Sequence, residues 1–156
     1  MNTYTGNAGV AICLKDPDEV SEEIQNRVQT IVQTAEDVLF SDNFKDSKTG
    51  WRNYLDEKSV IDWYLIHEFA CMYDASDFYT SAYFYYNPKD KKLHMGPCWD
   101  YDTAMRRDFS PVTNTTGEPT VDGFEFAVIN SWYKRLFDDE QFYSSVKKDG
   151  LRKQKN

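Results

Sequence analysis

The chain has 156 residues, of which 40% are hydrophobic and 16% aromatic, so it is long and apolar enough to bury the core of one folded domain. Its formal net charge is -8, from 26 acidic and 18 basic residues, and no basic stripe interrupts the sequence. This argues against binding to nucleic acid or to an anionic membrane, because both need a positively charged surface. No apolar run reaches the roughly 18 residues of a membrane-spanning helix, and the first five residues have no signal-peptide pattern.

The metal-binding residue types that favour zinc are few and scattered. Cys13, Cys71 and Cys98 each lie in an apolar context without ligand spacing, which predicts three small buried side chains. His67 and His94 are equally isolated. We therefore expect no zinc site.

The first elements are a strand and a helix. Residues 10–14 form a short apolar run that predicts a buried strand, ended by Pro17. From Ser21, a plausible N-cap, apolar residues recur three or four positions apart and predict an amphipathic helix of about five turns. Its apolar face consists of Ile24, Val28, Ile31, Val32, Ala35, Val38 and Leu39.

A second helix is predicted over residues 60–72. Ser59, followed three residues later by Asp62, resembles a capping box. The helix is apolar around most of its circumference, which is typical of a central element. We expect His67 and Glu68, its polar exceptions, to be hydrogen-bonded structural groups.

A β-hairpin follows. Residues 82–86 are aromatic and predict a strand covered on both faces, residues 87–90 a turn, and residues 93–95 the returning strand. Acidic segments flank it, with Asp74 before the first strand and Asp100 and Asp102 after the second. Because a hairpin brings its two ends together, these carboxylates are candidates for one shared site.

Crowded carboxylates repel one another unless a cation neutralises them. Oxygen ligands favour Mg²⁺, Mn²⁺ or Ca²⁺ over zinc, and Mg²⁺ commonly holds substrate phosphates. An acidic loop, a hairpin and a metal-binding aspartate follow one another in this order in protein kinases. The alternative is that these are turn aspartates without a metal, and that the aromatic run is packing rather than a ligand platform.

The remaining residues predict a long functional or mobile loop at 110–123, and a short strand or a helical lead-in at 124–128. Two helices follow, one around Trp132, Leu136 and Phe137, and one that begins near Asp138. Phe142, Tyr143 and Val146 would form the apolar side of the last helix. No internal repeat divides the chain, so one domain is the economical interpretation.

The stretch from Ser59 to Asp102 resembles the CotH family, the spore coat protein H-like atypical protein kinases. The most specific part of this resemblance is Gly-Pro-Cys-Trp-Asp-Tyr-Asp at residues 96–102, and weaker similarity extends from the strand near Val10 to the helix around Trp132. The resemblance implies an α+β, protein-kinase-like fold, mainly the helical C-terminal lobe with a small β-hairpin around the catalytic and metal-binding loops. It also implies ATP and Mg²⁺ or Mn²⁺ as cofactors, and phosphotransfer to the serines of a protein substrate.

The resemblance assigns roles to four residues. Asp74 matches the catalytic-loop aspartate, Asp100 the metal-binding aspartate that also contacts the nucleotide, and Asp102 a second metal ligand. Ser81 falls where kinases commonly hold a second metal ion and contact the nucleotide through Asn, and a hydroxyl is the weaker Mg²⁺ ligand. The motif tends to continue into a Gly, where this chain has Met105, Arg106 and Arg107.

One strand before the first long helix leaves no room for a glycine-rich loop and a phosphate-binding lysine, since Lys15 is the nearest lysine. We therefore expect residues 1–156 to be a single CotH-like kinase domain that lacks most of its N-terminal lobe and transfers phosphate weakly or not at all. The alternative is a non-catalytic kinase-like binding module for a cation, a glycan or a protein partner. Acceptor, oligomeric state and compartment stay open, and secretion, the cell envelope and the spore coat are all compatible with the sequence.

Overall fold

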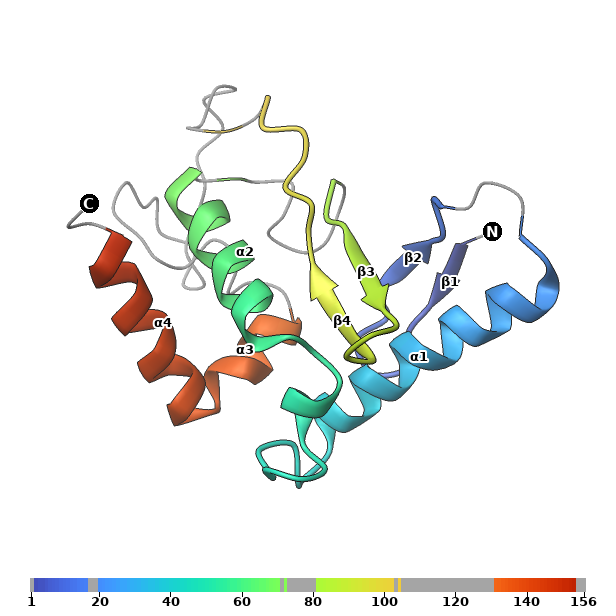
Figure 1. Cartoon of the computed structure of the whole chain (residues 1–156), viewed down its shortest axis with the longest axis horizontal. Helices are drawn as coiled ribbons and strands as arrows, with labels where there is room; N and C mark the ends of the chain where they lie inside the picture. The colour runs from blue at the N-terminus through green and yellow to red at the C-terminus, as the bar shows by residue number, and fades with distance from the viewer. Residues whose placement is uncertain are drawn as a thin grey trace.

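The computed structural model describes residues 2–16, 20–70, 72, 81–102, 104 and 131–153, and it has an α+β architecture. The predicted α+β class is confirmed. Two separate antiparallel hairpins, β1–β2 and β3–β4, accompany the helices (Figure 1). The strands are β1 (Asn2–Tyr4), β2 (Ala11–Cys13), β3 (Phe84–Asn87) and β4 (Lys92–Met95), and the helices are α1 (Glu22–Phe40), the 3-10 turn η1 (Trp51–Asn53), α2 (Glu57–Ala70), α3 (Ser131–Phe137) and α4 (Glu140–Lys153).

The N-terminal strand differs from its prediction. β2 spans Ala11–Cys13 rather than residues 10–14, and Ala11 and Cys13 are exposed, so the expectation of a buried strand is wrong. It pairs with β1, which the sequence did not predict. Cys13 and Cys98 are both exposed thiols, which also corrects their assignment as buried side chains. Cys71 lies outside the described residues.

Helix α1 forms as predicted. The Ser21 hydroxyl accepts a hydrogen bond from the Ile24 amide at 3.3 Å and satisfies one of the free donors of the first turn. Val32 and Leu39, on the predicted apolar face, are buried, whereas Ile24 near the N-terminus is exposed. The buried end of α1 therefore lies toward its C-terminus.

A tight loop joins α1 to η1, and Gly50 makes it possible. A Cβ atom at this position would lie 2.2 Å from the Phe44 carbonyl oxygen and 2.4 Å from that of Asp46. The close approach lets the Trp51 amide donate to the Phe44 carbonyl at 2.8 Å. Trp51 is thereby turned into the core, where it is fully buried.

Helix α2 begins three residues earlier than predicted. The Asp56 carboxylate caps it by accepting from the Ser59 amide at 2.8 Å, so Ser59 is not the N-cap. Asp62 pairs instead with Lys58, one turn before it. The helix is central, as expected, because eight of its side chains are buried, although Ile66 and Phe69 are exposed.

Helix α3 packs against α1 and helix α4 against α2, and the two predicted C-terminal helices are confirmed. Tyr133 of α3 is buried and donates from its hydroxyl to the Val60 carbonyl of α2 at 2.8 Å. Arg135 donates to the Leu39 carbonyl at 3.1 Å and to the Ser41 carbonyl at 3.0 Å, at the end of α1. It provides the positive charge that the last turn of α1 lacks. None of the described helices is long and apolar enough to cross a membrane.

Candidate functional site

The candidate site is built on the β3–β4 hairpin. Four antiparallel pairs, from Phe84 with Met95 to Asn87 with Lys92, define its register. Lys91 takes a left-handed conformation with φ of 60° and closes the turn, its amide donating to the Asn87 carbonyl at 2.8 Å. The predicted hairpin is confirmed, and its first strand begins two residues later than the aromatic run suggested.

The open end of the hairpin brings two predicted site segments together. The Gly96 amide donates to the Tyr83 carbonyl at 2.8 Å, which continues the pairing one step beyond the last strand pair. Ser81 lies two residues before Tyr83, and Asp100 lies four residues after Gly96. The segments that carry Ser81 and Asp100 therefore leave the hairpin at the same end (Figure 1).

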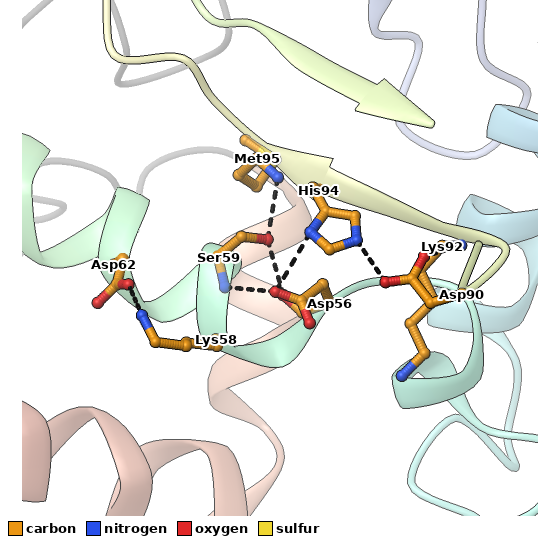
Figure 2. A network of polar contacts seen from close by, with 8 residues as sticks. All are labelled: Asp56, Lys58, Ser59, Asp62, Asp90, Lys92, His94 and Met95. Atoms are coloured by element: carbon orange, nitrogen blue, oxygen red, sulfur yellow. Dashed lines mark hydrogen bonds and ion pairs between the residues drawn. The ribbon is translucent and has the colours of Figure 1, made fainter. Parts of the chain in front are cut away.

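The N-terminus of α2 holds the hairpin in place. The Asp56 amide donates to the Leu93 carbonyl at 2.9 Å, and the Ser59 hydroxyl accepts from the Met95 amide at 3.1 Å. Figure 2 shows His94 between two carboxylates, with Nε2 2.8 Å from Asp90 and Nδ1 3.5 Å from Asp56. Strand β4 thus has backbone partners on both edges, which fixes the direction in which the chain leaves it.

The two faces of the hairpin differ. Phe84 and Tyr86 pack against the core, whereas Tyr85 is 52% exposed and stacks on the His94 ring at 5.1 Å between centroids. The expectation that both faces of β3 are covered is therefore wrong. The alternation of side chains along a strand explains the result, because only every second aromatic can reach the core.

Beyond the hairpin, Tyr101 is turned inward while its neighbours face solvent. Tyr101 is half-buried and packs against the core, and the carboxylates of Asp100 and Asp102 on either side are exposed. Burial raises the pKa of Tyr101, and its hydrogen bond with Cys98 raises it further. The hydroxyl is therefore protonated at neutral pH and is available as a donor.

That donor faces His67 of α2. The Tyr101 hydroxyl lies 3.4 Å from His67 Nε2, and the two rings are 5.4 Å apart. His67 is 1% exposed, and its Nδ1 lies 2.7 Å from the Trp63 carbonyl. Burial lowers the pKa of His67, which favours the neutral ring. The expectation that His67 is a hydrogen-bonded group is confirmed.

The predicted site residues have different outcomes. Asp74 lies outside the described residues, so its position relative to the others stays a prediction. Ser81 is half-buried, and both it and Asp100 have a left-handed backbone with φ of 58°. Asp102 lies one residue beyond the inward-facing Tyr101 and is exposed.

A magnesium ion fits the donor chemistry of this segment. Asp100 and Asp102 offer hard oxygen ligands, are exposed, and accept no hydrogen bond from other side chains in the described part of the chain. Among the described residues no three His, Cys, Asp or Glu side chains gather as a complete metal cage. Mg²⁺ does not require one, because it is commonly held by one or two carboxylates together with waters and substrate phosphates.

The chain was compared with known protein families, curated proteins and solved structures. A family model described as CotH kinase protein matches residues 11–150. The chain belongs to the CotH kinase family. Searches of curated proteins and of solved structures gave no match. The CotH match runs from β2 into α4, so the family assignment rests on nearly the whole chain.

Sequence reasoning did not connect His67 with Tyr101, although it singled out each neighbourhood. The two residues are 34 positions apart, and their local partners, Trp63 for His67 and Cys98 for Tyr101, do not point to the contact. The position of His67 on a largely apolar helix was the one available signal. A buried histidine needs a hydrogen-bond partner for each of its two ring nitrogens, so a second partner for His67 could have been expected. The CotH motif at 96–102 contains the aromatic residue that satisfies it.

Proposed function

We propose that this CotH chain is a protein-kinase-like domain that binds ATP together with Mg²⁺ at the open end of the β3–β4 hairpin. The observation that carries the proposal is the anchored segment after β4. Tyr101 is turned into the core while Asp100 and Asp102 stay exposed on either side of it. Such an arrangement holds two carboxylates in place without using them for packing.

In this proposal Asp100 and Asp102 hold the divalent ion, and the ion shields the charge of the nucleotide phosphates. Asp74 accepts the proton of the attacking hydroxyl, and Ser81 contacts the nucleotide or a second ion. The shared exit of the Ser81 and Asp100 segments supports their place in one site. The acceptor is a serine of a protein substrate, by analogy with the family.

We expect phosphotransfer by this chain to be weak or absent. Within this chain Lys15 is the only lysine before α1, and it is exposed beyond the end of β2. A lysine that pairs with nucleotide phosphates normally projects from a sheet over the site. Ser81 is also a weaker metal ligand than the amide that kinases commonly use at that place.

Isothermal titration calorimetry tests the binding step. Mg²⁺-ATP is titrated into the wild-type protein, Asp100→Ala, and Asp42→Ala as a control, since Asp42 is an exposed carboxylate in the loop after α1. We expect Asp100→Ala to weaken binding at least about tenfold and Asp42→Ala to leave it unchanged. Equal affinity in all three proteins would remove Asp100 from the site.

A transfer assay with radiolabelled ATP tests the catalytic step. Label that appears on a protein substrate or on the chain itself should disappear in Asp74→Asn, because the amide cannot accept the hydroxyl proton. Nucleotide affinity measured on the same variant should stay close to wild type. Equal incorporation by both proteins would exclude Asp74 as the base.

A second candidate function is binding without transfer, and the exposed stack of Tyr85 on His94 favours it. An exposed aromatic face beside the carboxylate of Asp90 is suited to a glycan or to a peptide side chain. Tyr85→Ala should then weaken capture of such a partner while Mg²⁺-ATP binding stays intact. Loss of nucleotide binding in that variant would instead assign the stack to the stability of the hairpin.

A further inference from the structure

His67 is held rigidly from one side. Its ring stacks on Trp63 with 3.9 Å between centroids, and Nδ1 lies 2.7 Å from the Trp63 carbonyl oxygen. A carbonyl can only accept, so Nδ1 carries the proton and donates it. In the neutral ring Nε2 is then an acceptor whose direction is set by the helix.

The group that meets this acceptor is the Tyr101 hydroxyl, at 3.4 Å. Since Nε2 accepts, a hydrogen bond here requires the hydroxyl to donate its one proton, for which Cys98 also competes. The ring contact at 5.4 Å adds packing to the polar contact. The backbone of Tyr101 is also engaged, because its carbonyl accepts from the Ala104 amide at 3.1 Å.

The backbone around Tyr101 needs such an anchor. Asp100 has φ of 58°, a left-handed conformation that an aspartate tolerates at some cost. Its side chain and that of Asp102 accept no bond from the rest of the described chain that would hold the segment in place. The inward side chain of Tyr101 lies between them.

We infer that His67 is a positioning residue, which holds the Asp100–Asp102 segment in its metal-binding geometry by accepting the Tyr101 hydroxyl. The inference deepens the proposed function and rests on it for the role of the two carboxylates. His67 itself touches neither metal nor nucleotide. It acts through Tyr101, from a helix that is fixed in the core.

Three substitutions separate this role from simple packing. Tyr101→Phe removes one hydroxyl and keeps the ring. His67→Asn keeps a donor near the position of Nδ1 and loses the acceptor at Nε2, whereas His67→Gln places an amide oxygen near Nε2 and should rescue the contact. Tyr101→Phe keeps the packing but also removes the contact with Cys98. Compared with Cys98→Ala, which should behave as wild type, it serves as the test should His67→Asn fail to fold.

The ligand-free readout is the NMR order parameter of the backbone amides of residues 99–102. We expect about 0.85 in the wild type and in His67→Gln, and a fall toward about 0.6 in Tyr101→Phe and His67→Asn. Unchanged order parameters in the last two variants would overturn the inference, even where their unfolding free energy falls.

The second readout is the affinity for Mg²⁺-ATP in the same proteins. We expect about tenfold weaker binding in Tyr101→Phe and His67→Asn, and near-wild-type binding in His67→Gln, as is usual when a residue behind a metal ligand is lost. Wild-type affinity in all variants would also overturn the inference. If the wild type itself does not bind Mg²⁺-ATP, the proposed function fails, while the order parameters still decide whether His67 positions the segment.

Discussion

Two pairs of carboxylates in this molecule are placed in opposite ways. Glu36 and Asp139 are buried, and each accepts three hydrogen bonds, including one from a tryptophan far away in the sequence. Asp100 and Asp102 are exposed and accept none from the rest of the described chain. The difference separates carboxylates that hold the fold together from carboxylates that are left available to a cation.

Glu36 shows what a structural carboxylate looks like. One oxygen accepts from the Asn7 and Ala8 amides at 2.9 and 3.2 Å, and the other accepts from the Trp132 indole at 2.7 Å. The side chain thereby joins the β1–β2 hairpin, α1 and α3. With its oxygens taken up by donors, it has little capacity left for a metal ion.

The largest expected effect is on Glu36. Glu36→Gln should lower the free energy of unfolding by about 3 kcal/mol, because the amide NH2 would face either the two backbone amides or the Trp132 indole, and all of these donors need an acceptor. Urea denaturation measures the change. Asp37→Asn, at the exposed neighbouring position, is the control and should stay within about 0.5 kcal/mol of wild type. If Glu36→Gln lowered the free energy of unfolding by much less, the buried carboxylate would not be the structural group that this comparison requires.

A smaller effect, about 2 kcal/mol, is expected for Asp139→Asn. Asp139 Oδ2 accepts from the Trp51 indole at 3.0 Å and from Arg52 at 2.6 Å, and Oδ1 caps α4 through the Gln141 amide. Burial raises the pKa of Asp139, but its hydrogen bonds to Trp51 and Arg52 outweigh burial, and the net shift is downward.

The lowered pKa of Asp139 predicts a dependence of stability on pH. The folded state keeps this carboxylate ionised more readily than the unfolded chain does, where its pKa is near 3.8. Its contribution is therefore complete above that value and is lost as the pH falls through the lower folded pKa. The difference in unfolding free energy between wild type and Asp139→Asn should shrink as the pH falls from about 5 to about 2, and a constant difference would contradict the assignment.

The smallest effect on stability is expected for the exposed pair. Asp100→Asn and Asp102→Asn should each change the free energy of unfolding by no more than about 0.5 kcal/mol, because neither carboxylate makes a hydrogen bond or ion pair with the described residues. Thermal or urea unfolding without nucleotide measures this. A fall in the free energy of unfolding as large as that of Asp139→Asn would show that Asp100 and Asp102 are structural, like the buried carboxylates.

The local patterns of the sequence predicted the local structure well. Ser21 caps α1 as expected and the β3–β4 hairpin forms, whereas the predicted apolar face of α1 is buried only toward its C-terminus, with Ile24 exposed. Ser59 misled the prediction, because Asp56 caps α2 and the Ser59 hydroxyl is used to accept from Met95. Asp56 and Ser59, three positions apart, are both residue types that cap helices. Asp56 takes this role in the structure, and the Ser59 hydroxyl binds the Met95 amide of strand β4.

Long-range polar contacts could not be predicted in this way. Glu36 accepts from Trp132, which is 96 residues away, and Asp139 from Trp51, which is 88 residues away. A glutamate within the apolar stripe of α1 was the available signal for the first, since Glu36 follows the buried Ala35. The motif assigned metal-binding roles to Asp100 and Asp102, which stay predictions, whereas Tyr101, the half-buried residue between them, carried no role in it.

The most direct test measures Mn²⁺ bound by the protein without nucleotide, by the loss of the free-ion electron paramagnetic resonance signal, because ATP alone would also remove that signal. The proteins are wild type, the double variant Asp100→Asn/Asp102→Asn, and Asp42→Asn as the control. We expect the wild type and Asp42→Asn to bind the ion equally and the double variant to lose binding while it stays folded. Equal binding by all three proteins would contradict the claim that the exposed carboxylates form the metal site.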